Sequence, residues 1–224
     1  MSNPSLLIIA ALFVGLGSFV FGFLAGFAIK TFHRYRARTN QNRGEAAVHN
    51  VILSNFPPPH YHLLNNITIP IQGGTTQIDH VLVSTRGVFV IETKNYSGWI
   101  FGDEKSKSWM QVLYKVKNRF QNPVHQNFLH VKAIQQLLDF LPKEQIHSVV
   151  VFTGNGQFKT TVPQGVIYLN QLVGFLRNFQ NETISANRVE FCVGRLECTR
   201  YEVTKLTDLQ HRAYLAQKFA KFNG

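Results

Sequence analysis

The sequence predicts a mixed α/β domain that follows a single apolar helix. Three features support this prediction: an uncharged run over residues 6–29, alternating apolar residues typical of strands between residues 61 and 102, and a helix start at Asn122 and Pro123. The predicted elements follow in the order α-β-β-β-(β)-α-β-β-α-α around one sheet, which differs from a regular alternation of strands and helices.

The apolar run has 24 residues and no charged side chain. A helix of this length rises about 36 Å, which is enough to cross a hydrocarbon core of about 30 Å. A cleaved signal peptide is the alternative, but no Lys or Arg precedes the run and no clear cleavage site follows it. We therefore expect residues 1–29 to be an N-terminal transmembrane anchor in the cell membrane, with residues 6–29 crossing the lipid.

The distribution of charge predicts how this anchor is oriented. All 23 Lys and Arg residues follow residue 29, and five of them lie in a basic linker over residues 30–43 that contains no acid. Because positively charged flanks stay on the cytoplasmic side, we expect the N-terminus outside and the C-terminal domain in the cytoplasm. The linker is expected to contact anionic lipid headgroups, with nucleic-acid contact as the alternative.

Small residues recur at every fourth position within the anchor, at Ser18, Gly22 and Gly26. This spacing allows two membrane helices to approach closely, which would give a homodimer. Glycine is also frequent in membrane helices that form no such pair. Both interpretations stay open.

The first part of the globular region is predicted to hold a helix and a strand. Apolar residues share one stripe over about residues 44–54, and the prolines at 57–59 end that helix. A strand follows over residues 61–71. It contains Pro70, and proline is a residue that edge strands tolerate. Residues 72–77 are expected to form a loop.

The rest of the region begins with a hairpin over residues 77–95 and strands over 97–102 and 107–118. A helix over residues 122–141 starts with Asn-Pro, a favoured cap and first residue, and ends before a proline. Beyond it the sequence predicts two strands and two helices, over residues 146–152, 165–169, about 170–179 and 206–222.

Several function classes find no support in the sequence. Cys192 and Cys198 match no zinc spacing and are expected to be free thiols. The Gly-rich stretch over residues 152–158 lacks the Lys-Ser/Thr of a phosphate loop and is interpreted as a turn. Trp99 and Trp109 are interpreted as core residues.

After residue 43 there are 18 Lys and Arg against 12 acids, a net charge of +6 that permits a polyanionic partner without requiring one.

The hairpin carries three charged residues near its open end. If its turn spans residues 84–87, the antiparallel register places Asp79 opposite Glu92 on one face, with Lys94 one step beyond. A slip of one residue would move these side chains to opposite faces. The arrangement therefore depends on the position of the turn.

Two carboxylates that face each other across a ladder destabilise it unless something compensates their charge. A divalent cation does so most simply, and Mg²⁺ takes one or two carboxylates while keeping water or binding phosphate. A neighbouring lysine can position water or stabilise charge on a phosphate. The alternative interpretation is that Asp79 caps a loop while Glu92 and Lys94 form a surface ion pair.

Three stretches together resemble the NERD family, the nuclease-related domain, within the PD-(D/E)xK nuclease superfamily. They are Gly44-Glu45 at the first helix, QIDHVLVSTRGVFVIETKNYSG over residues 77–98, and FQNPVHQNFLH over residues 120–130. The resemblance covers about residues 43–155. It implies a restriction-endonuclease-like α-β-β-β-α-β core over residues 44–155, with residues 156–224 as a C-terminal α/β extension of the same domain.

The resemblance also implies roles for individual residues. Asp79 and Glu92 match the acids that bind metal, Mg²⁺ or Mn²⁺, and Lys94 matches the catalytic lysine. Glu45 matches the helix-borne acid that completes the metal site in many relatives. Gln126 matches a polar residue that faces the cleft.

Two further positions bear on the resemblance. His130 lies one helical turn after Gln126 and is expected to face the same way. Ile78 stands where the superfamily name has its first proline, at a position that varies widely. The function implied is Mg²⁺-dependent cleavage of DNA by a membrane-anchored nuclease. The alternative, from another class, is a catalytically silent membrane-tethered module that binds nucleic acid or acts as a scaffold.

Overall fold

The computed structural model describes residues 39, 41–202, 211, 213 and 214. The predicted anchor, including Ser18, Gly22 and Gly26, and most of the predicted helix over residues 206–222 lie outside these residues. Of the helices within the described part, none combines the length and the apolar character that a membrane span requires. The chain divides into two compact units, residues 1–42 and 43–224, and the fold below is that of the second.

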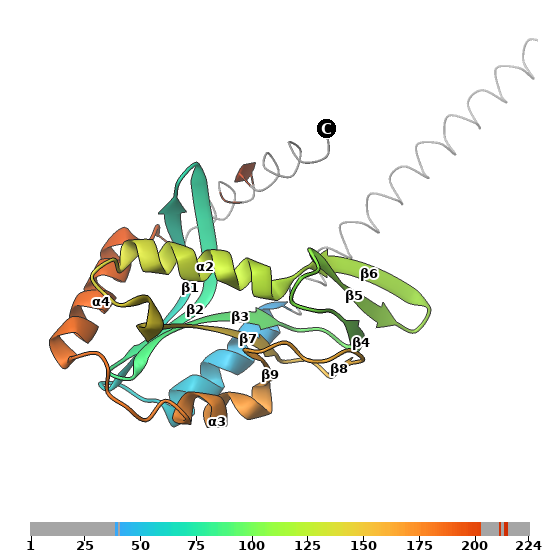
Figure 1. Ribbon diagram of the computed structural model, residues 1–224, viewed down its shortest axis with the longest axis horizontal. Coiled ribbons are helices and arrows are strands. Elements are labelled where there is room, and N and C mark those ends of the chain that lie inside the picture. The colour runs from blue at the N-terminus through green and yellow to red at the C-terminus, as the bar shows by residue number, and fades with distance from the viewer. Residues whose placement is uncertain (1–38, 40, 203–210, 212, 215–224) are drawn as a thin grey trace, which may run out of the picture. The chain divides into compact units, whose positions relative to one another are not determined.

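A five-stranded sheet forms the centre of the domain (Figure 1), in the order β1-β2-β3-β7-β9. The first three strands are antiparallel, whereas β7 and β9 run parallel to β3. The strands are β1 (Tyr61–Ile71), β2 (Gly74–Ser84), β3 (Gly87–Lys94), β7 (Ile146–Phe152) and β9 (Val166–Tyr168). Pro70 lies in the edge strand β1, as its missing backbone donor predicts.

The prediction of one sheet is wrong, because a second sheet of four strands has the order β6-β5-β4-β8. Its strands are β4 (Gly98–Phe101), β5 (Ser108–Leu113), β6 (Val116–Gln121) and β8 (Gly156–Phe158). The stretch expected to be one strand over residues 107–118 turns back at Tyr114, whose φ is 54°. No Gly or Asn marks this turn, which is why the pattern missed it.

Two smaller boundaries also differ from the prediction. The loop expected over residues 72–77 shrinks to a tight turn that includes Gly73, whose φ of 80° suits glycine, and β2 already begins at Gly74. The stretch over residues 152–158 was expected to be only a turn, but it contains the short strand β8.

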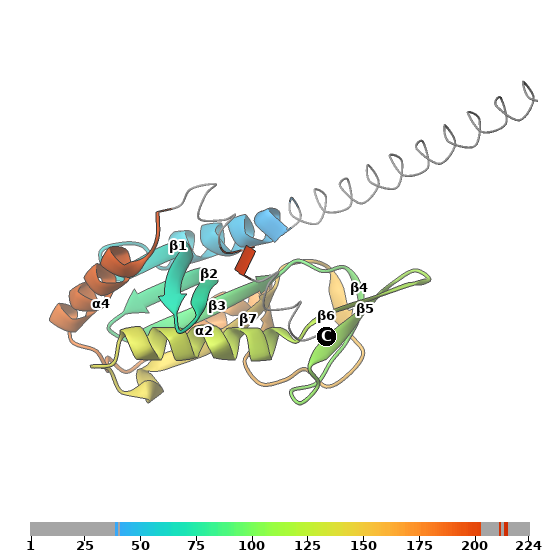
Figure 2. The same cartoon turned by 90° about the horizontal axis from the view of Figure 1, so that it is seen from above.

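Helices cover both faces of the five-stranded sheet. One face packs against α2 (Pro123–Leu137) and α4 (Ala186–Thr199). The other packs against the helix over residues 41–55 and α3 (Leu172–Arg177), through buried residues such as Ile52 and Leu172. Figure 2 shows α2 and the helix over residues 41–55 on opposite sides of the sheet. Short 3₁₀ turns, η1 (Lys143–Gln145) and η2 (Leu169–Gln171), precede β7 and α3.

The start of α2 is confirmed and α4 is new. The Asn122 side chain accepts a hydrogen bond of 2.9 Å from the Val124 amide, so the predicted cap is in place. No helix was predicted over residues 186–199, yet Val189, Cys192 and Leu196 form a buried stripe there at helical spacing. Both cysteines are free: Cys192 is buried in this stripe, where burial raises the pKa of its thiol to about 11, and Cys198 is exposed.

Candidate active site

The carboxyl end of β3 brings together the charged residues of the hairpin. The predicted register is confirmed, since Ser84 pairs with Gly87 and His80 pairs with Ile91. One further step along the ladder places Asp79 beside Glu92. The Asp79 carboxylate accepts a hydrogen bond of 2.8 Å from the backbone amide of Thr93, the residue that follows Glu92. Glu92 is buried, whereas Asp79 keeps part of its surface open to solvent.

Lys94 lies against Glu92 in this site. Its Nζ donates to Glu92 Oε1 at 2.6 Å, with only 14% of the lysine side chain exposed and 2% of the glutamate side chain. The other oxygen, Oε2, lies 3.2 Å from His130 Nε2. These two atoms are not aligned for a hydrogen bond, so Oε2 is a buried oxygen with no hydrogen-bond partner among the described residues. One side of the Glu92 carboxylate therefore has hydrogen-bonding capacity that the described residues do not use.

Helix α2 supplies the polar side chains above the strands. Gln126 Oε1 accepts a hydrogen bond of 3.1 Å from Lys94 Nζ. One turn later, His130 contacts Glu92 through Nε2 and bonds to Thr76 Oγ1 through Nδ1 at 2.8 Å. Gln126 and His130 therefore lie on the same side of the helix, as their spacing predicts.

Sequence reasoning missed Asn127, which fixes α2 on the sheet. The buried amide of Asn127 donates to the backbone oxygens of Val90 at 2.9 Å and Val149 at 3.1 Å, and to Ser148 Oγ at 2.8 Å. These partners belong to β3 and β7, so one side chain holds the helix against both strands. A polar residue on the buried face of a predicted helix was the signal that could have identified it.

The helix over residues 41–55 brings Glu45 to the same end of the sheet. Glu45 is half-buried and lies near enough to Asp79 for its charge to raise the pKa of that carboxyl. The preceding residue, Gly44, is buried against Thr153 and Asn95. All five residues that the resemblance singled out therefore gather at one place.

The electrostatics of the site differ between the two strand acids. Burial raises the pKa of Asp79 well above its ordinary value, and the charges of Glu92 and Glu45 raise it further. Burial also acts to raise the pKa of Glu92, but Lys94 and then His130 outweigh it, and the pKa is lowered. Lys94 stays a cation, because Glu92 and Asp79 outweigh the burial that would lower its pKa.

A neighbouring histidine stays neutral. Burial, together with the nearby His49, lowers the pKa of His80 to about 4. Its Nδ1 donates to Asn65 Oδ1 at 2.7 Å. His80 therefore adds no positive charge to the site at neutral pH, and the acids are partly balanced by Lys94.

The donor set suits a hard divalent cation. Asp79 and Glu92 supply carboxylate oxygens from adjacent strands, and Glu92 Oε2 has no hydrogen-bond partner among the described residues. No three His, Cys, Asp or Glu side chains in the described part are arranged as a complete metal site. Mg²⁺ needs only one or two carboxylates beside water and phosphate oxygens, so these residues fit it.

Comparison with known proteins identifies the family of the chain. The family described as the nuclease-related domain, NERD, matches residues 40–153. An uncharacterised protein of Bacillus anthracis is 34% identical over 181 residues, which cover 76% of this chain and 81% of the relative. No solved structure matches the chain significantly.

The close packing of Gly44 predicts that a methyl group there is destabilising. A Cβ would lie 2.6 Å from Thr153 Oγ1 and 2.8 Å from Asn95 Cβ, so either these side chains or the helix that carries Glu45 must shift. We expect Gly44→Ala to lower the free energy of unfolding by about 1–3 kcal/mol, measured by denaturant titration.

Gly194 in α4 is the matched control, because a Cβ there meets nothing within 4 Å. Gly194→Ala should raise the free energy of unfolding by up to about 1 kcal/mol, through helix propensity alone. Wild-type stability of Gly44→Ala would contradict the close packing of this helix on the strand ends.

Proposed function

The chain belongs to the nuclease-related domain (NERD) family, part of the PD-(D/E)xK-like nuclease superfamily, and we propose that it is a membrane-anchored nuclease that hydrolyses DNA with Mg²⁺ or Mn²⁺. The observation that carries this proposal is the pair of acids Asp79 and Glu92 on neighbouring strands, with Lys94 2.6 Å from Glu92. The order of the helix over residues 41–55, β1, β2, β3, α2 and β7 supports a restriction-endonuclease-like core.

The balance of charge supports a bound divalent cation. The charges of Glu92 and Glu45 both raise the pKa of Asp79, and Lys94 is the cation that acts against them on Asp79 and on Glu92. A pure structural role would not favour this arrangement, because like charges in a partly buried site destabilise the fold. A divalent cation held by Asp79 and Glu92, and by Glu45 as the resemblance implies, would compensate the remaining charge.

The proposed reaction is attack of water on the phosphorus of a phosphodiester. The new P–O bond forms as the bond to the leaving oxygen breaks, and that oxygen takes up a proton. A bound Mg²⁺ or Mn²⁺ would polarise the phosphate and lower the pKa of a bound water.

The residues of the chain act on the same atoms. Lys94 Nζ would hold the attacking water and stabilise the negative charge that develops on the phosphate oxygens. Glu92 and Gln126 fix Lys94 in place, with donor–acceptor distances of 2.6 and 3.1 Å. Asp79 is partly exposed to solvent.

One observation favours the second candidate, a silent membrane-tethered module that binds nucleic acid. Lys94 and His130 lie against the two oxygens of Glu92, which closes that carboxylate from within the domain. In this alternative the ion pair is structural and the domain binds without turnover. The two candidates differ in whether cleavage depends on metal.

A cleavage assay tests the nuclease proposal. The full chain in detergent is incubated with plasmid and single-stranded DNA in Mg²⁺, Mn²⁺ or EDTA. We expect metal-dependent cleavage that falls at least about 100-fold in Lys94→Ala and Asp79→Asn, because each removes a group that contacts the reacting phosphate or the metal.

Lys143→Ala is the control, since Lys143 is exposed in η1 at the amino end of β7. It should cleave at the wild-type rate. Cleavage by Asp79→Asn at the wild-type rate would reject the assigned site, and the absence of any cleavage by the wild type would favour the silent module.

The membrane anchor is the second part of the proposal. The uncharged run over residues 6–29 and the basic linker after it support a single span with the globular domain in the cytoplasm. After alkaline carbonate extraction of cell membranes, the full chain should stay in the pellet, whereas a chain that starts at residue 30 should be released. Release of the full chain by carbonate would contradict the anchor.

A further inference from the structure

The second sheet turns one face to solvent and the other to the core. Ile100 and Trp109 are buried, and the Trp109 ring stacks on Phe152 with the ring centroids 6.2 Å apart. Because side chains alternate along a strand, their sequence neighbours point the opposite way. The registers of β4, β5 and β6 place six side chains on that outer face, in the rows Trp99–Val112–Lys117 and Phe101–Met110–Arg119.

This outer face combines an exposed aromatic ring with several cations. Trp99, expected to be a core residue, is instead 52% exposed. Lys159 Nζ lies 5.0 Å from the centre of its ring. Lys117 and Arg119 are exposed at the ends of the two rows, and neither side chain forms an ion pair or hydrogen bond within the described part of the chain.

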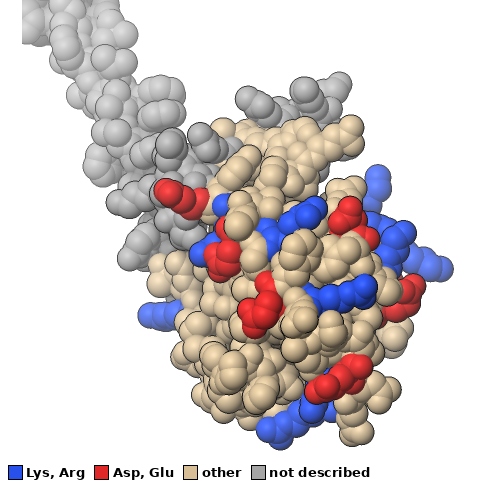
Figure 3. All heavy atoms as spheres, turned by 90° about the vertical axis from the view of Figure 1, so that its left-hand side faces the viewer, with Lys and Arg blue, Asp and Glu red and all other residues tan. Residues whose placement is uncertain are grey.

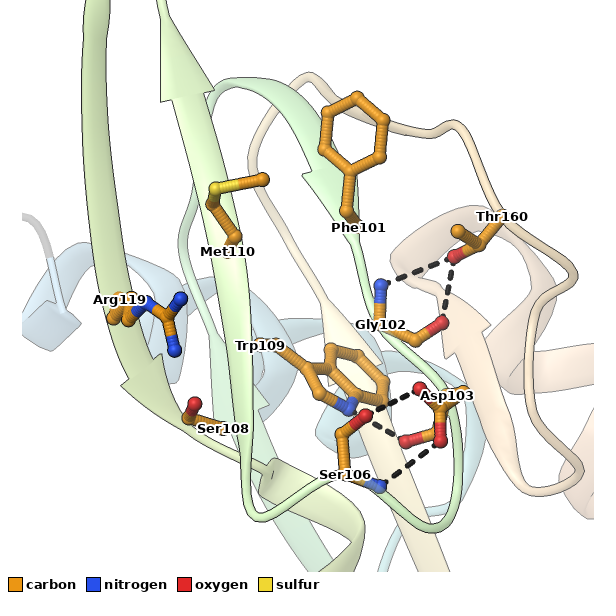
Figure 4. A pocket seen from close by; sticks show the side chains of 9 residues that line it. All are labelled: Phe101, Gly102, Asp103, Ser106, Ser108, Trp109, Met110, Arg119 and Thr160. Atoms are coloured by element: carbon orange, nitrogen blue, oxygen red, sulfur yellow. Dashed lines mark hydrogen bonds between the residues drawn. The ribbon is translucent and has the colours of Figure 1, made fainter.

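A hollow lies beside the second row of this face (Figure 4). Its volume is about 250 Å³, and Phe101, Met110 and Arg119 are among its lining residues. The hollow is lined by residues of β4, β5 and β6, by the loop between β4 and β5 and by Thr160, and none of the carboxylates of the candidate active site lines it. Asp103 also lines it, but that carboxylate is already bonded to the Ser106 hydroxyl and amide.

Charge is arranged differently at the other end of the domain. Lys, Arg, Asp and Glu are interspersed on the side that carries α4 (Figure 3), so that face offers no continuous surface of one sign. The two rows on the outer face of the second sheet contain two charged residues, Lys117 and Arg119, and both are cations. A polyanion therefore finds charge complementarity on the second sheet.

We propose that the outer face of the second sheet binds single-stranded nucleic acid. Unpaired bases stack on Trp99 and Phe101, which lie two residues apart on β4, about 7 Å along the strand. Lys117, Arg119 and Lys159 pair with the phosphates. Trp99 is exposed and Phe101 is half-buried. Solvent-accessible aromatic rings flanked by cations are the features that bind single strands, because every base offers a face for stacking.

The position of this sheet in the chain links it to the candidate active site. β4 begins at Gly98, four residues after Lys94, and β6 ends at Gln121, five residues before Gln126. Three strands of the sheet, β4, β5 and β6, are therefore inserted between β3, which carries Lys94, and α2, which carries Gln126. The inference rests on the proposed function in one respect, because it takes the strand bound on this face to be the substrate of the nuclease.

A binding experiment without turnover tests the inference. The full chain in nanodiscs of phosphatidylcholine is titrated in EDTA with labelled oligo-dT and oligo-U, and with a DNA duplex of equal length. We expect both single strands to bind more tightly than the duplex. They should also quench the fluorescence of Trp99, since the second of the chain's two tryptophans, Trp109, is only 1% exposed.

The variants separate stacking from charge. Trp99→Ala should weaken single-strand binding roughly tenfold or more, as expected for loss of one stacked base. Arg119→Ala should make the dependence of log affinity on log salt concentration shallower by about 0.7, the value for one phosphate contact on a single strand.

Phe128→Ala is the matched control. Phe128 is another exposed aromatic residue with a cation over its ring, Lys132 Nζ at 5.3 Å, but it lies on α2. This variant should bind as the wild type does. Unequal affinity for oligo-dT and oligo-U would identify the preferred kind of strand.

Two results would overturn the inference. One is equal binding of duplex and single strand with no effect of Trp99→Ala. The other is a shift of Trp99 emission on adding phosphatidylglycerol to the nanodiscs, with no response to oligonucleotide, which would assign this face to the membrane surface. Because EDTA prevents metal-dependent cleavage, binding is measured whether or not the chain proves to be a nuclease.

Discussion

The ion pair between Lys94 Nζ and Glu92 Oε1 is the interaction on which the rest of the site depends. A buried carboxylate that loses its partner destabilises a fold by about 3–5 kcal/mol. Here the lysine keeps Glu92 ionised, while Gln126 and His130 link the pair to α2. A well-packed apolar pair of the same volume is often as stable as a buried ion pair. The fold therefore gains little from these charges, and their presence points to chemistry.

The sheet and its helices hold this pair next to a second acid, Asp79, whose pKa is raised by burial and by the charges of Glu92 and Glu45. The hairpin register brings Asp79 beside Glu92, and Asn127 fixes α2 on β3 and β7 through three hydrogen bonds. Gly44 lets the first helix approach the strand ends, so Glu45 adds to the repulsion on Asp79. The folded core therefore keeps these acids close together, at a cost in free energy. A bound cation, or a substrate with its metal, would relieve that cost.

The sequence predicted the features that local rules control. The hairpin turn follows from alternation and Gly87, and the start of α2 follows from the preferences of Asn122 and Pro123. The features that it did not predict depend on tertiary contacts. The turn at Tyr114 has no glycine signal, and Trp99 could be placed outside only once the register of the second sheet was known. The hydrogen bonds of Asn127 join residues distant in sequence, which periodicity cannot reveal.

The most direct test of the account is whether the acids bind a divalent cation, measured without reference to catalysis. Thermal unfolding of the full chain is followed in Mn²⁺ and in EDTA for the wild type, Asp79→Asn and Glu144→Gln, an exposed acid in η1. A ligand at 100 times its Kd stabilises the native state by about 2.7 kcal/mol, which raises Tm by about 5 °C or more. The account predicts this rise in the wild type and Glu144→Gln but not in Asp79→Asn. An equal rise in all three proteins, or none in the wild type, would contradict it.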